Sequence, residues 1–126
     1  MKIKRFAVLS FFCTALSSSA IVFGAEHSVL EAGEKQFSKC ATCHSLEVDK
    51  HMAGPSLAGL EDRTAGSQPG FIYSFALEES SIVWTQETLS LFLEDPQRIV
   101  PGNVMAFGGL RKAEQREALI VYLLDR

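Results

Sequence analysis

The sequence predicts an all-α domain in which three main helices are joined by long loops. Three segments carry helical periodicity or helix-capping signals, and no segment has a strong strand pattern. The stretch between the first two helical segments, residues 45–72, contains six Gly or Pro residues and little regular pattern. Because unstructured loops of that length are unusual in a compact domain, we expect a bulky cofactor to complete the core.

Residues 1–25 have the layout of a secretory signal peptide. Three Lys or Arg residues precede a mostly apolar run over residues 6–16, and small residues follow. Cleavage is expected within residues 20–25, at a bond that the sequence leaves open. The alternative is an uncleaved anchor, because residues 6–25 reach the length of about 20 residues that spans a bilayer. The folded domain is then residues 26–126.

The charge of this domain limits its partners. It has nine Lys and Arg residues against fifteen Asp and Glu residues, which gives a formal net charge of −6 with neutral His. Nucleic-acid binding usually requires a basic surface, so we expect no nucleic-acid partner. A domain of about 100 residues buries a modest share of its surface, so its stability is expected to be marginal.

The first helix is predicted over residues 28–40, "SVLEAGEKQFSKC". Val29, Leu30, Gly33 and Phe37 can share one face of this helix. The predicted helix leads directly into a cysteine motif.

The motif "KCATCHS" at residues 39–45 separates Cys40 from Cys43 by two residues, and His44 follows at once. A thioredoxin-like redox pair would need a βαβ setting, and the strand patterns are missing. A structural zinc site usually needs four ligands, and the adjacent Cys43 and His44 cannot easily point at one tetrahedral ion. The spacing C-x-x-C-H is the signature of covalent c-type haem attachment, with His44 placed to bind the iron.

The second helix is predicted over residues 85–96, "TQETLSLFLEDP". Thr85 is a suitable N-cap with Thr88 three residues later, and Pro96 stops the helix. The segment "VPGNVMAFGG" that follows reads as a loop. Residues 111–126 then form an amphipathic helix with apolar residues such as Leu119 on one side.

Haem iron either takes a second axial ligand or leaves that position open. Met105 lies in a loop between two helices, 61 residues after His44, where it can reach the opposite face of a haem. The other candidates are His27, His51 and Met52, and the last two follow His44 so closely that they would have to loop quickly round the haem edge. Methionine is usually an apolar filler, but the loop context favours Met105 as the ligand.

Six motifs in a fixed order resemble those of the class I c-type cytochromes, in particular the mitochondrial-like and bacterial short soluble monohaem members. The resemblance covers nearly all of residues 30–126. It implies the cytochrome c fold, with three main helices and long loops wrapped around one covalent haem c. The motifs are "GEKQFSKCATCHS" at 33–45, "GPSLAGL" at 54–60, "RTAGSQPGFIYS" at 63–74, "IVWTQETLSLFLEDP" at 82–96, "VPGNVMAF" at 100–107 and "REALIVYL" at 116–123.

Carried over residue by residue, the resemblance implies the parts of the haem site. Cys40 and Cys43 would be the thioether anchors, and His44 and Met105 the axial ligands of the iron. The backbone carbonyl of Pro55 would accept the other ring N–H of His44, which fixes the tautomer of the ligand.

The resemblance also implies three contacts to the haem propionates, from Arg63, Tyr73 and Trp84. A buried propionate needs cationic or hydrogen-bonding partners, because an unpaired buried charge is costly. Without the resemblance, these residues read as a surface arginine and two core aromatics. Gly33 and Tyr122 would mark the crossing of the first and last helices.

Three positions depart from the family pattern. Phe92 stands where the family often has Tyr, Leu77 where it has Asn, and Val104 where it has Lys before the ligand methionine. Because Phe92 and Leu77 are apolar where the family has polar residues, the side of the pocket near Met105 should be drier. His51 is expected to be a structural histidine that bonds backbone groups between loops.

The resemblance implies a periplasmic one-electron carrier rather than an enzyme, with redox proteins as electron donor and acceptor. We expect a monomer with no membrane span after signal cleavage. The alternatives are a five-coordinate haem enzyme or gas-binding protein of peroxidase-like type, a haem-free thiol oxidoreductase, and a membrane-tethered haem subunit of a dehydrogenase or oxidase complex.

Overall fold

The computed structural model of the chain describes residues 20–125, so the predicted signal peptide lies for the most part outside the described residues. Within this range the chain has no strand beyond an isolated bridge between Thr64 and Val83, which confirms the all-α prediction. None of the described helices is long and apolar enough to cross a membrane. The helices are α1 (Ala20–Phe37), α2 (Phe75–Glu78), α3 (Gln86–Glu94), α4 (Pro96–Ile99) and α5 (Ala113–Leu124).

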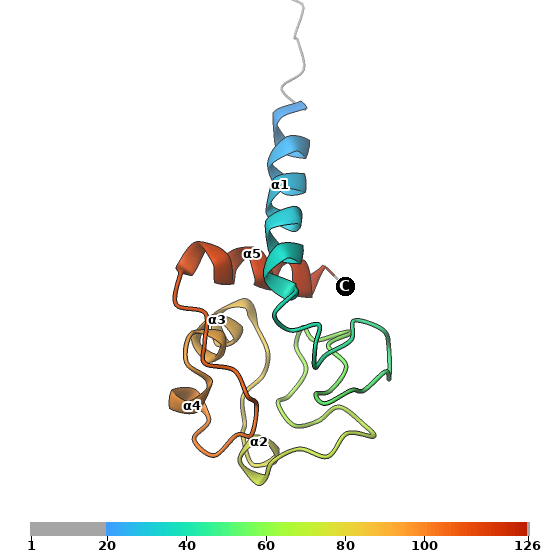
Figure 1. Cartoon of the computed structure of the whole chain (residues 1–126), viewed down its shortest axis with the longest axis vertical. Coiled ribbons are helices and arrows are strands. Elements are labelled where there is room, and N and C mark those ends of the chain that lie inside the picture. Colours follow the sequence, from blue (N-terminus) through green and yellow to red (C-terminus); the bar gives the residue numbers. More distant parts are fainter. Residues whose placement is uncertain (1–19, 126) are drawn as a thin grey trace, which may run out of the picture.

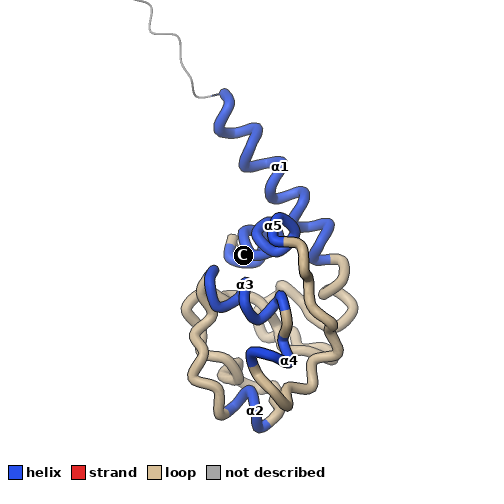
Figure 2. The backbone as a smooth tube through the Cα atoms, turned by 90° about the vertical axis from the view of Figure 1, so that its left-hand side faces the viewer, coloured by secondary structure: helices blue, strands red, loops and turns tan. Residues whose placement is uncertain are grey.

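Helices α1 and α5 lie at one end of the molecule, and most of the remaining chain forms a lower body beneath them. Figure 1 shows α1 crossing α5 steeply, with α3 and α4 on one side of this lower body and the long segment from α1 to α2 on the other side. Figure 2 shows how much of this lower body is loop, because only the one-turn helices α2 and α4 and the longer α3 interrupt it. The predicted division into three main helices and long loops is therefore confirmed.

Gly33 lies where α1 crosses α5. A Cβ atom built on Gly33 would clash with the carbonyl oxygen of Ala118 and would lie 2.5 Å from the Cβ of Tyr122. The rings of Phe37 and Tyr122 pack beside this point, with centroids 5.7 Å apart. The missing side chain thus allows the close helix contact that the family resemblance implied.

Replacing Gly33 with alanine should lower the free energy of unfolding by about 1–3 kcal/mol, because the added methyl group overpacks the crossing. The same exchange in an exposed helix stabilises by roughly 0.5–1 kcal/mol, so a loss of stability would show that the crossing is overpacked. Thermal unfolding of the haem-loaded protein measures the change. Glu34→Ala, at the exposed neighbouring position, is the control and should stay within about 0.5 kcal/mol of wild type. Equal stability of Gly33→Ala and wild type would contradict the crossing argument.

The structure differs from the predicted helix bounds at both ends of the first helix. Helix α1 begins at Ala20 rather than Ser28, because residues 20–27 contain no proline and no Ser, Thr, Asp or Asn that could cap a later start. It ends at Phe37, where the backbone tightens into a turn and the amide of Cys40 donates to the Phe37 carbonyl at 2.8 Å.

The predicted N-terminus of the second helix is confirmed in detail. The side chains of Thr85 and Thr88 each accept a hydrogen bond from the other residue's backbone amide, which forms a capping box at the start of α3. The helix ends at Glu94 because Asp95 caps a new turn, its carboxylate accepting from the Arg98 amide at 3.2 Å. The sequence predicts no helix after Asp95, because Pro96 reads as a stop, so the short helix α4 is a difference from the prediction.

Arg116 ties the last loop to the helices. This buried residue of α5 donates from its guanidinium to the carbonyl oxygens of Leu110 and Arg111 at 2.9 Å each, and it lies 3.8 Å from the Glu94 carboxylate. The amide of Leu110 donates to the Leu93 carbonyl at 2.7 Å. The loop that carries Met105 is therefore fixed at its far end.

Candidate functional site

The two cysteines of the motif lie on one tight turn after α1. The amides of Cys43 and His44 both donate to the Cys40 carbonyl at 2.9 Å, so the turn sets the separation of the two sulfur atoms. Both cysteines are free and partly buried. Burial raises the pKa of the Cys40 thiol, an effect that the charge of Lys39 opposes. A thiol oxidoreductase needs a low-pKa thiolate, so this environment opposes that alternative.

The ring of His44 is held by the next loop. Its Nδ1 lies 2.8 Å from the carbonyl oxygen of Pro55. A carbonyl can only accept, so Nδ1 carries the proton and Nε2 keeps its lone pair. The loop is brought to the ring by Gly54, whose amide donates to the Cys43 carbonyl at 2.7 Å. The expected bond between His44 and Pro55 is therefore present, with the nitrogen suited to metal binding left over.

Gly54 is packed against the imidazole itself. A Cβ atom built there would lie 2.7 Å from Nδ1 and 2.8 Å from Nε2 of His44. Sequence reasoning placed this glycine in a family motif but did not assign it this contact. The contact means that no side chain larger than hydrogen fits behind the ring without moving it.

Replacing Gly54 with alanine should destabilise the haem-loaded protein by about 1–3 kcal/mol, because either the His44 ring or the Pro55 loop must shift. Gly108→Ala is the matched control, since a Cβ atom built at Gly108 meets nothing within 4 Å. Differential scanning calorimetry of the two variants against wild type measures the difference. Equal melting temperatures for both variants would show that the ring tolerates the extra methyl group.

Met105 approaches the core from a distant part of the chain. It is partly buried and packs against the same apolar cluster as Cys40. The other candidate ligands are less suited: Met52 is 45% exposed, and His27 lies on the open surface of α1 beside Glu31. The structure thus favours Met105 among the candidates that the sequence left open.

His51 uses both of its ring nitrogens in contacts to backbone groups. Its Nδ1 accepts from the Ser56 amide at 3.1 Å, so its Nε2 carries the proton and donates to the Pro69 carbonyl at 2.9 Å. These bonds join two loops and leave no lone pair for a metal. The interpretation of His51 as a structural histidine is confirmed.

Arg63 carries a charge that its protein partners do not neutralise. Its Nη2 donates to the Ser56 carbonyl at 3.1 Å, and its Nη1 donates to the Ala58 carbonyl at 2.9 Å and to the side-chain oxygen of Gln68. All these partners, within residues 20–125, are uncharged. Burial lowers the pKa of Arg63, an effect that Tyr73 opposes.

Tyr73 and Trp84 lie close to Arg63. Burial raises the pKa of the Tyr73 phenol, and the backbone of Gln68 and the charge of Arg63 oppose this. The amide of Trp84 donates to the Arg63 carbonyl at 2.9 Å, and its indole is buried against Phe92 with ring centroids 5.0 Å apart. The structure therefore places Arg63 and Tyr73 close together and joins Trp84 to Arg63 through the backbone.

Ser74 is a candidate that sequence reasoning missed. Its side-chain hydroxyl is buried and has no hydrogen-bond partner among the described residues. Ser74 directly follows Tyr73, so an acidic group held near Tyr73 and Arg63 could accept from it. A lone hydroxyl and an uncompensated guanidinium both fit a cofactor that carries carboxylates, as haem does through its propionates. The sequence gives no signal for this role, because only the burial of the hydroxyl without a partner reveals it.

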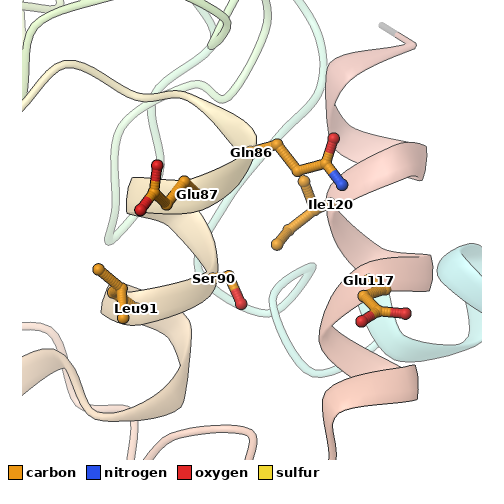
Figure 3. A pocket seen from close by; sticks show the side chains of 6 residues that line it. All are labelled: Gln86, Glu87, Ser90, Leu91, Glu117 and Ile120. Atoms are coloured by element: carbon orange, nitrogen blue, oxygen red, sulfur yellow. The ribbon is translucent and has the colours of Figure 1, made fainter.

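A surface hollow lies between α3 and α5 (Figure 3). It contains none of the residues predicted for the haem site. Its lining is mixed, with carboxylates beside aliphatic groups, so its shape does not identify a second cofactor site. The residues that line it are Gln86, Glu87, Ser90, Leu91, Glu117 and Ile120.

Comparisons with known proteins agree with this geometry. A family model described as cytochrome c matches residues 30–126. Cytochrome c of Chlamydomonas reinhardtii is 46% identical over 96 residues, which cover 75% of this chain and 86% of that protein. Cytochrome c2 iso-2 of Magnetospirillum molischianum is 42% identical over 87 residues, which cover 69% and 90% of the two chains.

The fold has a counterpart among solved structures. Cytochrome cH from Methylobacterium extorquens superposes with a TM-score of 0.72 at 36% identity, and the match covers 77% of this chain and 98% of that chain. The all-α architecture is thus the cytochrome c fold. Cys40 and Cys43 have the spacing of the C-x-x-C-H haem-attachment motif. From the family match, the relatives and the fold together, the chain belongs to the cytochrome c family of electron carriers, whose cofactor is covalent c-type haem.

Proposed function

We propose that the chain is a periplasmic one-electron carrier with one haem c, whose iron is bound by Nε2 of His44 and by the sulfur of Met105. Cys40 and Cys43 hold the haem through thioether bonds. Arg63, Tyr73 and Trp84, together with Ser74, bind its propionates. When bound, the haem supplies an iron that cycles between the ferric and ferrous states.

The observation that carries the proposal is the hydrogen bond from His44 Nδ1 to the Pro55 carbonyl at 2.8 Å. It fixes the tautomer that leaves Nε2 free, orients the ring, and makes that nitrogen a better donor. The imidazole packs directly against Gly54, so it cannot tilt toward that loop. A histidine held in this way on a cysteine turn is suited to permanent iron ligation.

The protein groups suit electron transfer more than catalysis. A thioether is a soft ligand that favours ferrous iron, so Met105 raises the reduction potential. Two protein ligands leave no position for a substrate at the metal. The buried side chains of Trp84 and Phe92 keep water out of their part of the core, and the apolar Phe92 adds no hydrogen bond. Less water means less reorganisation when an electron arrives or leaves.

The setting of the carrier follows from the sequence. Residues 1–25 read as an export signal, so the mature domain would work in the periplasm as a monomer. There it would meet a respiratory or dehydrogenase donor and a terminal acceptor, both redox proteins. Its net charge of −6 makes nucleic acid an unsuitable partner.

Spectroscopy and mass spectrometry of the exported protein test this function. We expect a red protein whose mass includes one haem after denaturation, a weak ferric band in the far red from methionine ligation, and reversible one-electron reduction. A colourless protein with a Cys40–Cys43 disulfide would refute the proposal. A covalent haem without the far-red band, combined with rapid binding of carbon monoxide, would favour the five-coordinate enzyme or gas-binding protein. Recovery only in the membrane fraction would favour the tethered subunit.

A further inference from the structure

The loop that carries Met105 is poorly covered by the rest of the protein. The side chains on either side, Val104 and Ala106, are exposed, and Val104 is 78% exposed. Gly102 precedes them with a positive φ of 88°. Side-chain burial therefore gives this part of the loop little stability, and Met105 needs another anchor to hold one position.

Asn103 provides such an anchor. It is only 5% exposed, although it lies in the middle of the exposed loop. Its side-chain nitrogen donates to the carbonyl oxygens of Pro96 at 2.9 Å and Val100 at 2.8 Å. Its side-chain oxygen accepts from the backbone amide of Met105 at 3.1 Å. One amide group thus joins Met105 to both ends of α4.

The backbone of Asn103 is held as well. Its amide donates to the Val100 carbonyl at 3.1 Å, and its carbonyl accepts from the side chain of Gln97 at 2.8 Å. Helix α4, which bears Gln97, is itself fixed by the Asp95 cap. The chain of contacts from α4 through Asn103 to Met105 is therefore continuous.

We infer that Asn103 is a positioning residue that holds the backbone of Met105 where its sulfur can bind the iron. The inference rests on the proposed His44 and Met105 ligation. Only a primary amide can donate twice and accept once within this geometry, so the side chain chemistry is specific. Without it, the Met105 loop would open more often, and the sixth coordination position would be exposed for a larger fraction of the time.

The test measures the affinity with which imidazole replaces Met105 on the ferric protein. Loss of the far-red band monitors this replacement. Because an outside ligand binds only the open form, its apparent affinity rises in proportion to the open fraction. Asn103→Ala removes three hydrogen bonds, each of modest net value, so we expect the imidazole affinity to rise about tenfold or more. Hydrogen exchange of the Met105 amide should accelerate in parallel.

Two further variants separate positioning from general stability. Gln97→Ala removes one bond to Asn103 and should raise the imidazole affinity in the same direction but by less, and it serves if Asn103→Ala does not fold. Thr85→Ala removes the side-chain cap of α3 and lowers the stability of the protein, but it should leave the imidazole affinity unchanged.

The outcomes distinguish this inference from the ligation on which it rests. A normal wild-type far-red band with unchanged imidazole affinity in Asn103→Ala would overturn the positioning role alone. An equal rise in Thr85→Ala would also overturn it, because general destabilisation would then explain the effect. Absence of the far-red band in the wild type would overturn the Met105 ligation and the positioning role together.

Discussion

Replacing both Cys40 and Cys43 with alanine should leave a chain that does not fold cooperatively at 25 °C. A domain of about 100 residues has a total stability of roughly 5–15 kcal/mol, and its side-chain core is small for its loop content. Several large apolar side chains remain exposed, for example Ile72, which is 90% exposed, and Phe75 on α2. A bound haem offers a large apolar plate on which the helices and loops can pack, so its loss removes more than the net stability.

Circular dichroism of this double variant, produced without haem, checks the expectation. The far-ultraviolet signal should show little helix, and heating should give no sigmoidal transition. The haem-loaded wild type, purified from the same compartment, is the control for expression and export. Adding free haem to the variant should restore part of the helix signal, because His44 and the propionate-binding residues remain. A cooperative thermal transition in the haem-free variant would show that the polypeptide core suffices.

The local features of this fold were predictable because they depend on neighbouring residues. The capping box of Thr85 and Thr88 lies within one turn, so its pattern is visible in four letters of sequence. The C-x-x-C-H motif has the same property, because one tight turn fixes its geometry. The role of Gly33 is not local, and it was predicted only through the resemblance to a family with this helix crossing.

The contacts that sequence reasoning missed depend on burial or on segments that come together only when the chain folds. Ser74 is unremarkable in sequence, and only its burial without a partner marks it as a candidate for the propionates. Asn103 reads as a turn residue after Gly102, and its bonds to Pro96 and Val100 require the loop to fold back on α4. Helix α4 was missed because its proline is tolerated at the first helical position, where no amide donor is needed.

The choice of the second iron ligand also needed both the sequence and the structure. Residues 26–126 offer four His and Met side chains besides His44, and spacing and loop context alone ranked them. Burial and hydrogen bonding separate them further, since His51 has both nitrogens engaged while Met52 and His27 are exposed. Met105 is the remaining candidate that is partly buried and packs against the core.

Met105→Ala should keep its haem but lose the sixth ligand. The thioether bonds of Cys40 and Cys43 and the bond from His44 do not involve Met105, so attachment is unaffected. If the methionine-free form is about 1% populated in the wild type, exposing it fully raises the apparent affinity for an outside ligand about 100-fold. The reduction potential should fall, because the soft thioether no longer favours ferrous iron.

Titration of the ferrous variant with carbon monoxide and of the ferric variant with imidazole measures this opening, and loss of the far-red band reports it directly. Met52→Ala is the matched control, because it removes the same side chain from an exposed loop near His44 and should behave as wild type. The comparison with Asn103→Ala adds a graded test, since loosening the loop should give a smaller change in the same direction than removing the sulfur. If Met52→Ala opened the position and Met105→Ala did not, the iron would be bound from the near loop, and the role given to Asn103 would fall with the assignment.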